Sequence, residues 1–173
     1  YKDRYREALP APVDSGYPIV LESDRCSAFV ALTIDGIDPA APSPDWMAQR
    51  LRASGVRSIS LPVDVTNYVM LESGQPLHAY DAAKLRGPIR VRLANEGETL
   101  RTLDGQDRVL DVDDLLITDD SGPIGLAGVM GGESTQVSDT TTSIVLEAAA
   151  FAQASVSRTF RRHSLPSEAS KRF

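Results

Sequence analysis

Thr66, Asn67 and His78 lie close to the expected end of one helix. Between them, Gly74 suits the left-handed conformation that ends many helices, and Pro76 prevents the helix from continuing. A hydroxyl, an amide and an imidazole are thereby brought to one helix end. Neither a Ser–His–Asp nor a Cys–His arrangement is visible, so hydrolysis at this place would use a positioned water rather than a covalent intermediate. On spacing alone, a polar helix end capped by its own side chains is an equally good interpretation.

Three further segments carry groups that fit a binding site. Gly131 and Gly132 follow an expected strand, where a ligand can approach their backbone N–H groups, although a glycine pair is most often a simple turn. Glu147 ends an apolar run and precedes three alanines, so it lies near the surface or has a partner. Ser167 and Ala169 belong to a loop of small residues after a helix, where an ordinary N-cap is the alternative interpretation.

Periodicity predicts the elements that position these groups. Apolar and basic residues alternate from Pro88 to Leu93, which indicates a strand, and Asp104-Gly105 between two apolar stretches indicates a hairpin. The strands form one block from about residue 89 to 146 with helices outside it, which favours a single α+β domain with mostly antiparallel sheets. We also expect a buried strand at 26–34, an irregular strand at 124–130, and helices at 44–54, 62–73 and 152–163.

Composition bounds the class of protein. The 173 residues, 42% hydrophobic and 24% charged, are typical of one globular domain with a core of ordinary size. Residues 1–22 are polar and then proline-rich, so we expect a connector from a preceding region of a longer chain, and a domain at 23–173. One cysteine and two histidines argue against a zinc site. The single cysteine fits a reducing, cytoplasmic location, and no apolar run is long enough to cross a membrane.

Charge is distributed unevenly along the chain. The net charge of −6 argues against a freestanding nucleic-acid-binding protein. Residues 158–172 nevertheless hold five Lys or Arg against one Glu, and such a basic end can accept a phosphate backbone locally. Without other context, a solvated helix face is the better interpretation of this segment.

Four segments together resemble one known family. TNYVMLESGQPLHAYD, LAGVMGGE, LEAAAF and LPSEASKRF occur here in the order and at the approximate spacing seen in the editing domain of the β subunit of bacterial phenylalanyl-tRNA synthetases. The resemblance extends from about Cys26 to Phe173. It implies that the domain is of that editing type and that it hydrolyses the ester of tyrosine wrongly attached to tRNA(Phe). The whole enzyme would ligate phenylalanine to tRNA(Phe) using ATP.

The resemblance also implies a role for each matching residue. His78, Asn67 and Thr66 would be the catalytic group around the ester and the terminal ribose, with His78 either a general base or an orienting group. The substrate-binding group would be Glu147, for the tyrosine phenol, and Gly131, Ala169 and Ser167. Gly131 and Ala169 would leave room for the aromatic ring. The family usually has threonine at position 167 and often arginine at 166, where this chain has Ser167 and Pro166, so pocket fit and RNA contact there depart from the family pattern.

A synthetic pocket and a separate editing pocket would together distinguish tyrosine from phenylalanine. A hydrophobic synthetic pocket rejects an added hydroxyl only about 100-fold, whereas a second pocket with a buried acceptor prefers that hydroxyl. By resemblance, the partners would be the acceptor end of tRNA(Phe) and an α subunit in an α2β2 tetramer. ATP and Mg²⁺ would serve ligation elsewhere in the enzyme, with no cofactor in this domain. A non-catalytic module that positions tRNA or contacts a subunit is the alternative, and a metal hydrolase is disfavoured for want of ligands.

Overall fold

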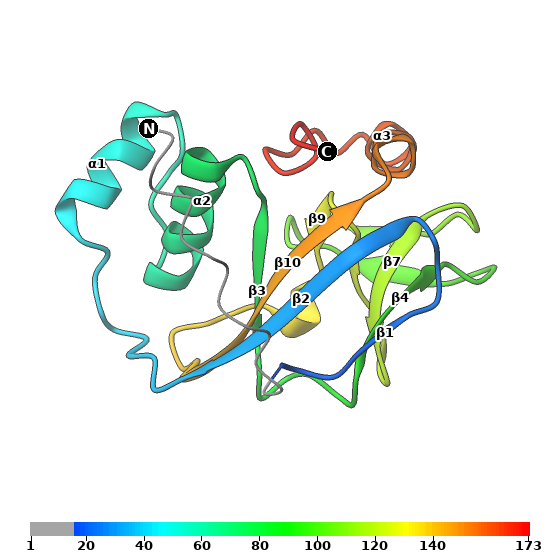
Figure 1. Cartoon of the computed structure of the whole chain (residues 1–173), viewed down its shortest axis with the longest axis horizontal. Helices are drawn as coiled ribbons and strands as arrows, with labels where there is room; N and C mark the ends of the chain where they lie inside the picture. The colour runs from blue at the N-terminus through cyan, green and yellow to red at the C-terminus, as the bar shows by residue number, and fades with distance from the viewer. Residues whose placement is uncertain (1–15) are drawn as a thin grey trace.

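Two β-sheets and three helices make up the computed structural model, which describes residues 16–173 (Figure 1). The larger sheet has five strands in the order β1-β4-β7-β8-β9, and the smaller has three in the order β2-β10-β3. Strands β5 and β6 form a separate hairpin. Every strand pair is antiparallel except β1 with β4. The predicted α+β class with mostly antiparallel sheets is therefore confirmed.

The strands and helices have the following bounds. The first three strands along the chain are β1 (Ile19–Leu21), β2 (Cys26–Asp35) and β3 (Leu77–Asp81). The helices are α1 (Asp45–Ala53), α2 (Leu61–Ser73) and α3 (Gln153–Arg162), with a short 3-10 turn, η1 (Glu133–Thr135). The later strands are β4 (Ile89–Leu93), β5 (Thr99–Arg101), β6 (Asp107–Val109), β7 (Leu115–Asp119), β8 (Gly122–Leu126), β9 (Met130–Gly131) and β10 (Ser143–Phe151).

Strand β10 is the centre of the smaller sheet and sets the geometry of the later site. Its register places Glu147 directly opposite Ala31 of β2 on one side and His78 of β3 on the other. Residues directly opposite in an antiparallel pair project from the same face of the sheet. The imidazole and the carboxyl therefore become neighbours although they are far apart in the sequence.

The helices begin and end within two residues of their predicted bounds, and the predicted end of α2 is confirmed. Gly74 has φ 82°, in the left-handed region, and its N–H donates to the carbonyl of Met70 at 2.9 Å. Helices α1 and α2 lie together on the side of β3 (Figure 1). A buried carboxylate, Asp64, fastens the segments before and after α1, because it accepts the Ser43 hydroxyl at 2.5 Å and the Ile59 N–H at 2.8 Å. These bonds tie α2 to the segments on either side of α1.

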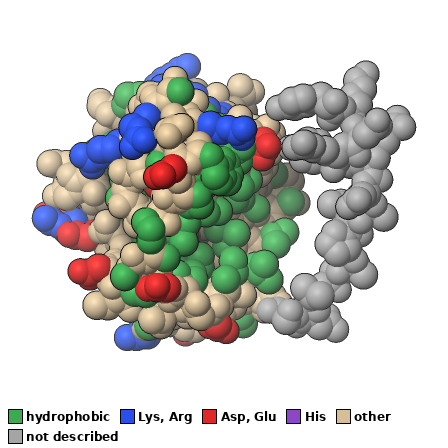
Figure 2. Space-filling model, turned by 90° about the vertical axis from the view of Figure 1, so that its left-hand side faces the viewer, with side chains coloured by type: hydrophobic (Ala, Val, Ile, Leu, Met, Phe, Trp, Pro, Cys, Tyr) green, Lys and Arg blue, Asp and Glu red, His purple; other side chains and the backbone are tan. Residues whose placement is uncertain are grey.

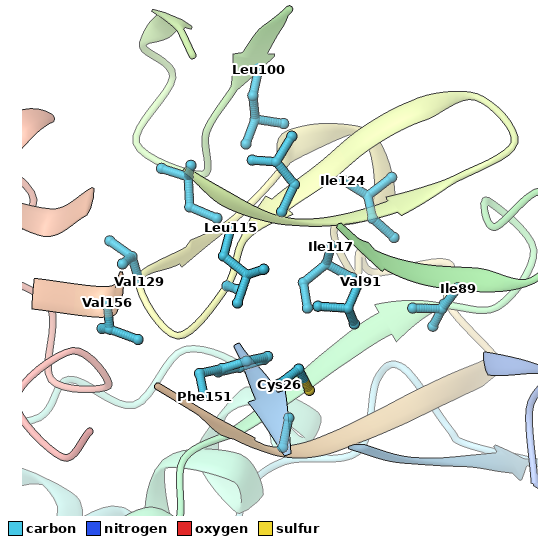
Figure 3. Packing of buried hydrophobic residues seen from close by; sticks show 14 of the residues in the cluster. Cys26, Ile89, Val91, Leu100, Leu115, Ile117, Ile124, Val129, Phe151 and Val156 are labelled. Atoms are coloured by element: carbon cyan, nitrogen blue, oxygen red, sulfur yellow. The ribbon is translucent and has the colours of Figure 1, made fainter. Parts of the chain in front are cut away.

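The core lies between the two sheets. Figure 3 shows Cys26 and Phe151, from the smaller sheet, facing Val91, Leu115 and Ile117 of the larger one. All five are less than one-tenth exposed. Burial of large apolar side chains at roughly 1.5–3 kcal/mol each is the main stabilising contribution to such a two-layer arrangement. The sheets therefore form a firm wall on both sides of the site described below.

The predicted connector ends earlier than expected. Residues 1–15 lie outside the described residues, so the first part of that prediction is not addressed by the structure. Residues 19–21, which the prediction included in the connector, instead form β1 and pair in parallel with Ile89–Val91 of β4. Three residues between a proline and polar neighbours are too few to show a strand pattern in the sequence. They form a strand only because they pair with the distant β4.

Two strand predictions are right in place but wrong in character. Strand β2 exists, yet only Cys26 and Ala31 in it are buried, whereas Val30 is 61% exposed and Leu32 and Ile34 are also exposed. Figure 2 shows hydrophobic side chains gathered over a broad area of the α1–α2 side of the molecule.

The expected single strand at 124–130 is two strands, β8 and β9, separated by a turn in which Gly128 has φ 70°. Within residues 16–173, no helix combines the length and the apolar character that crossing a bilayer requires.

Candidate active site

Two hollows meet at His78. The first, which we call the inner pocket, lies between the two sheets, and the residues of interest on its wall are His78, Tyr80, Gly131, Glu147, Phe151 and Ala169. The second, which we call the outer groove, lies beside α2 and is lined by Thr66 and Asn67 among others. Leu77 and His78 line both hollows. The cavity volumes, about 80 Å³ and about 860 Å³, make the inner pocket a place for a small group and the outer groove a place for a much larger one.

Glu147 is the acidic group of the inner pocket. Alternation along β10 directs Val145, Glu147 and Ala149 to the core face, so the carboxyl is only 7% exposed. Its Oε2 accepts a hydrogen bond from the Tyr80 hydroxyl. Burial raises the pKa of Glu147 to about 7, and the hydrogen bond from Tyr80 opposes that rise. Near neutral pH the group therefore exchanges between a carboxylate acceptor and a neutral acid.

His78 is a neutral imidazole with an unused nitrogen. Its ring meets the Tyr80 ring edge-on, with centroids 4.5 Å apart. Burial lowers the pKa of His78 to about 4, so the ring is uncharged at neutral pH. Its Nε2 is buried and has no hydrogen-bond partner among the described residues. Leaving a buried polar atom unpaired costs roughly 1–3 kcal/mol, and such atoms are concentrated where a ligand or water binds.

Gly131 makes room for His78. A Cβ atom at this position would lie 2.5 Å from Cε1 and 2.7 Å from Nε2 of the imidazole. The space that the missing side chain leaves is therefore filled by the histidine ring. The neighbouring N–H of Gly132, expected to be open to a ligand, donates instead to the carbonyl of Ile124 at 2.7 Å. Any backbone donor toward a reacting group would have to come from elsewhere.

Thr66 and Asn67 line the outer groove from α2. The Thr66 hydroxyl donates to the carbonyl of Val63 at 2.8 Å, the usual bond of a threonine to its own helix, so it is left as an acceptor. The half-buried Asn67 amide forms no hydrogen bond with any other described residue. Amide donors and acceptors that the protein does not use are available to a ligand in the groove.

Ala169 and Ser167 differ in their placement. Ala169 lines the inner pocket. Ser167 lines neither hollow, because its hydroxyl accepts the N–H of Ser170 at 3.0 Å while the Ser170 hydroxyl accepts the N–H of Ser167 at 3.0 Å. These two bonds form a local turn, and no helix follows it within the described residues, so Ser167 is not the N-cap that the alternative interpretation expected.

Tyr80 is the site residue that the sequence interpretation missed. It lies two positions after His78 in β3, and residues two apart in a strand share a face. That alternation was a signal available in the sequence, but only the register with β10 shows that the Tyr80 hydroxyl reaches the carboxyl of Glu147. Among residues 16–173, no three His, Cys, Asp or Glu side chains gather closely enough to hold a metal ion.

Comparison with known proteins places this arrangement in context. Residues 25–173 match the family model of the B3/4 domain. The chain is 59% identical over 166 residues to the phenylalanine–tRNA ligase β subunit of Thermobifida fusca, covering 95% of this chain and 20% of that protein. It is 56% identical over 173 residues to the corresponding subunit of Cutibacterium acnes, covering 100% of this chain and 21% of that protein. The chain thus spans about a fifth of the length of these curated relatives.

A solved structure resembles the fold. An N-terminal fragment of the phenylalanyl-tRNA synthetase β-subunit from Pyrococcus horikoshii superposes with a TM-score of 0.56 at 15% sequence identity. The match covers 77% of this chain and 42% of that one. At this identity the likeness is one of fold.

Proposed function

Because this chain belongs to the B3/4 domain family, we propose that it is the editing domain of a phenylalanine–tRNA ligase β subunit and hydrolyses tyrosine from mischarged tRNA(Phe). The single observation that carries the proposal is a buried carboxyl, Glu147, beside a half-buried imidazole, His78, whose buried Nε2 is unpaired among the described residues. The Glu147 carboxyl can select a phenol, and His78 lies where the inner pocket joins the outer groove. A substrate with a small aromatic side chain and a large nucleotide end fits hollows of these relative sizes.

Selection for tyrosine would rest on Glu147. The phenol hydroxyl would donate to the free carboxylate oxygen, since the other oxygen is already held by Tyr80. Phenylalanine entering the same pocket would displace water from that oxygen and would provide no hydrogen-bond donor to replace it. An unpaired buried acceptor costs roughly 1–3 kcal/mol, and more when it is charged, which is the basis of the discrimination.

Hydrolysis would use water as the nucleophile. The oxygen of the water attacks the ester carbonyl, the bond to the ribose oxygen breaks, and the water proton passes to that oxygen, giving free tyrosine and an intact tRNA end. Cys26 is a poor alternative nucleophile, because it is buried in the core and burial raises the pKa of its thiol. At a pKa of about 4, His78 is a weak base, so its role would be to hold the water or a ribose hydroxyl.

The outer groove would receive the end of the tRNA. Asn67, with its unused amide, and the acceptor side of the Thr66 hydroxyl would contact the terminal ribose. Ala169 and Gly131 border the place for the aromatic ring, and Ser167 would act only by shaping the adjacent turn. The same proposal includes an α subunit in an α2β2 assembly, a cytoplasmic location, and ATP with Mg²⁺ for ligation in another part of the enzyme.

Release of tyrosine from preformed tyrosyl-tRNA(Phe) by the assembled full-length enzyme tests the proposal. We expect the wild-type enzyme to release tyrosine far faster than buffer does, and His78→Ala to slow this release strongly. Glu96→Ala is a matched control, because Glu96 is exposed and outside both hollows. A wild-type rate equal to the spontaneous rate, with tRNA affinity reduced in His78→Ala, would instead support the alternative of a non-catalytic module that positions tRNA.

A further inference from the structure

Tyr80 contacts both polar groups of the inner pocket. It is 1% exposed, its hydroxyl donates to Oε2 of Glu147, and its ring meets the His78 ring at an interplanar angle of 78°. Register explains the arrangement: Tyr80 lies opposite Val145 of β10, two positions from the pair formed by His78 and Glu147 and therefore on the same face of the sheet. A buried tyrosine needs a partner for its hydroxyl, and here that partner is the group proposed to read the substrate.

Holding one carboxyl oxygen changes what the other can do. The terminal torsion of a glutamate is broad, so an unrestrained carboxyl samples many orientations. The hydrogen bond from Tyr80 removes much of that freedom. The second oxygen, Oε1, accepts no hydrogen bond from the described residues and is not among the fully buried unpaired polar atoms, and Glu147 lines the inner pocket, which a ligand can enter. The protein therefore presents a carboxyl with one oxygen fixed and one oxygen free.

We propose that Tyr80 is a specificity-determining positioning residue: its hydroxyl fixes the Glu147 carboxyl so that one oxygen remains for the phenol of the ligand. This inference rests on the proposed function. The Tyr80–Glu147 pair already shows that this carboxyl binds a phenol, and a ligand phenol would repeat the same contact at the other oxygen. Tyr80 would act through Glu147 without touching the ester.

The proton balance of the site gives this role a distinct signature. The titratable groups near Glu147 are His78 and Tyr80 on β3 and Cys26 on β2. His78 is neutral, and burial raises the pKa of both the Tyr80 hydroxyl and the Cys26 thiol. Burial raises the pKa of Glu147 and the Tyr80 hydrogen bond lowers it. Removal of the Tyr80 hydroxyl should therefore leave Glu147 protonated to a higher pH.

The test compares Tyr80→Phe with wild type in the assembled full-length enzyme. Deacylation rates of tyrosyl-tRNA(Phe) and phenylalanyl-tRNA(Phe) are measured on both sides of neutral pH. Near neutral pH we expect the ratio of these rates to fall about tenfold in the variant, from the loss of one hydrogen bond to a charged group. The ratio should recover only at higher pH. Tyr68→Phe removes a hydroxyl that accepts from Arg50, and Tyr68 lines neither hollow, so this control should leave the rate ratio and its pH profile unchanged.

A second readout does not depend on hydrolysis. The infrared band of the protonated Glu147 carboxyl, assigned by its loss in Glu147→Gln, is titrated in wild type and in Tyr80→Phe. We expect the midpoint to move to higher pH in the variant. An unmoved midpoint overturns the inference, as does an unchanged rate ratio in an enzyme whose wild type does release tyrosine. If wild type releases none, the proposed function fails, while the infrared midpoint still decides whether Tyr80 sets the state of the carboxyl.

Folding of the variant is controlled in the same preparation. Phenylalanine retains the buried ring, and attachment of phenylalanine to tRNA reports an intact assembly. If the variant does not assemble, Glu147→Gln tests the same point with Tyr80 in place. Its amide cannot titrate in this range, so the rate ratio should no longer depend on pH. A pH dependence equal to that of wild type would overturn the inference.

Discussion

Replacing Glu147 by alanine should separate recognition of the phenol from the chemistry of hydrolysis. The change removes the carboxyl from the inner pocket and leaves the Tyr80 hydroxyl without its partner. It does not touch Asn67 or Thr66 in the outer groove, and it leaves His78 on the neighbouring strand. The mutant site should therefore still bind the tRNA end while losing its means of telling tyrosine from phenylalanine.

The magnitude follows from the burial of the carboxyl. In the proposed wild-type reaction, the tyrosyl ester would pair with a buried acceptor, and the phenylalanyl ester would leave that acceptor unpaired. Since the difference is worth roughly 1–3 kcal/mol, the preference for tyrosyl-tRNA should fall by roughly one to two orders of magnitude. Cleavage of correctly charged phenylalanyl-tRNA should rise, because Glu147→Ala no longer penalises the unsubstituted ring.

The assay is a pair of deacylation rates, for tyrosyl-tRNA(Phe) and phenylalanyl-tRNA(Phe), in the intact enzyme. Glu96→Ala, at an exposed position, controls for the loss of a negative charge. If Glu147→Ala lowers both rates equally and keeps the wild-type ratio, then Glu147 acts on the water or the ester, and the division of roles argued above is refuted.

Two further outcomes test the packing and the proton balance of the site. Gly131→Ala should lower deacylation of both esters and reduce the free energy of unfolding by about 1–3 kcal/mol, measured by denaturant titration, because its Cβ would lie 2.5 Å from the His78 ring; an unaffected variant would show that the ring moves freely. Burial raises the pKa of Glu147 from 4.5 to about 7, so the folded protein binds this proton more tightly than the unfolded chain does. The resulting stability is present below pH about 4.5 and lost as the pH rises to about 7, a change on the order of 3 kcal/mol that Glu147→Gln should remove from the pH dependence of unfolding. Parallel curves for wild type and variant would contradict the raised pKa.

Local signals in the sequence determined the elements and their ends. Gly74 and Pro76 marked the end of α2, the Asp104-Gly105 pair marked the β5–β6 turn, and alternation over residues 89–93 marked β4. These features depend on backbone conformations that a residue and its near neighbours prefer, so they are readable without partners. Family motifs in the sequence also indicated six of the residues that line the two hollows.

The tertiary structure alone decided which groups meet and which faces are covered. Glu147 reaches His78 and Tyr80 through the register of β10 with β3, and a register is a property of two strands distant in sequence. The residues of β2 are apolar on both faces, so the sequence could not say that Val30 is exposed. The space beside Gly131 likewise belongs to His78 only once β9 and β3 are in place. Burial and pairing are set by the whole chain, and they turn residue types scattered along the sequence into a site with a neutral imidazole and a carboxyl that is held by one oxygen.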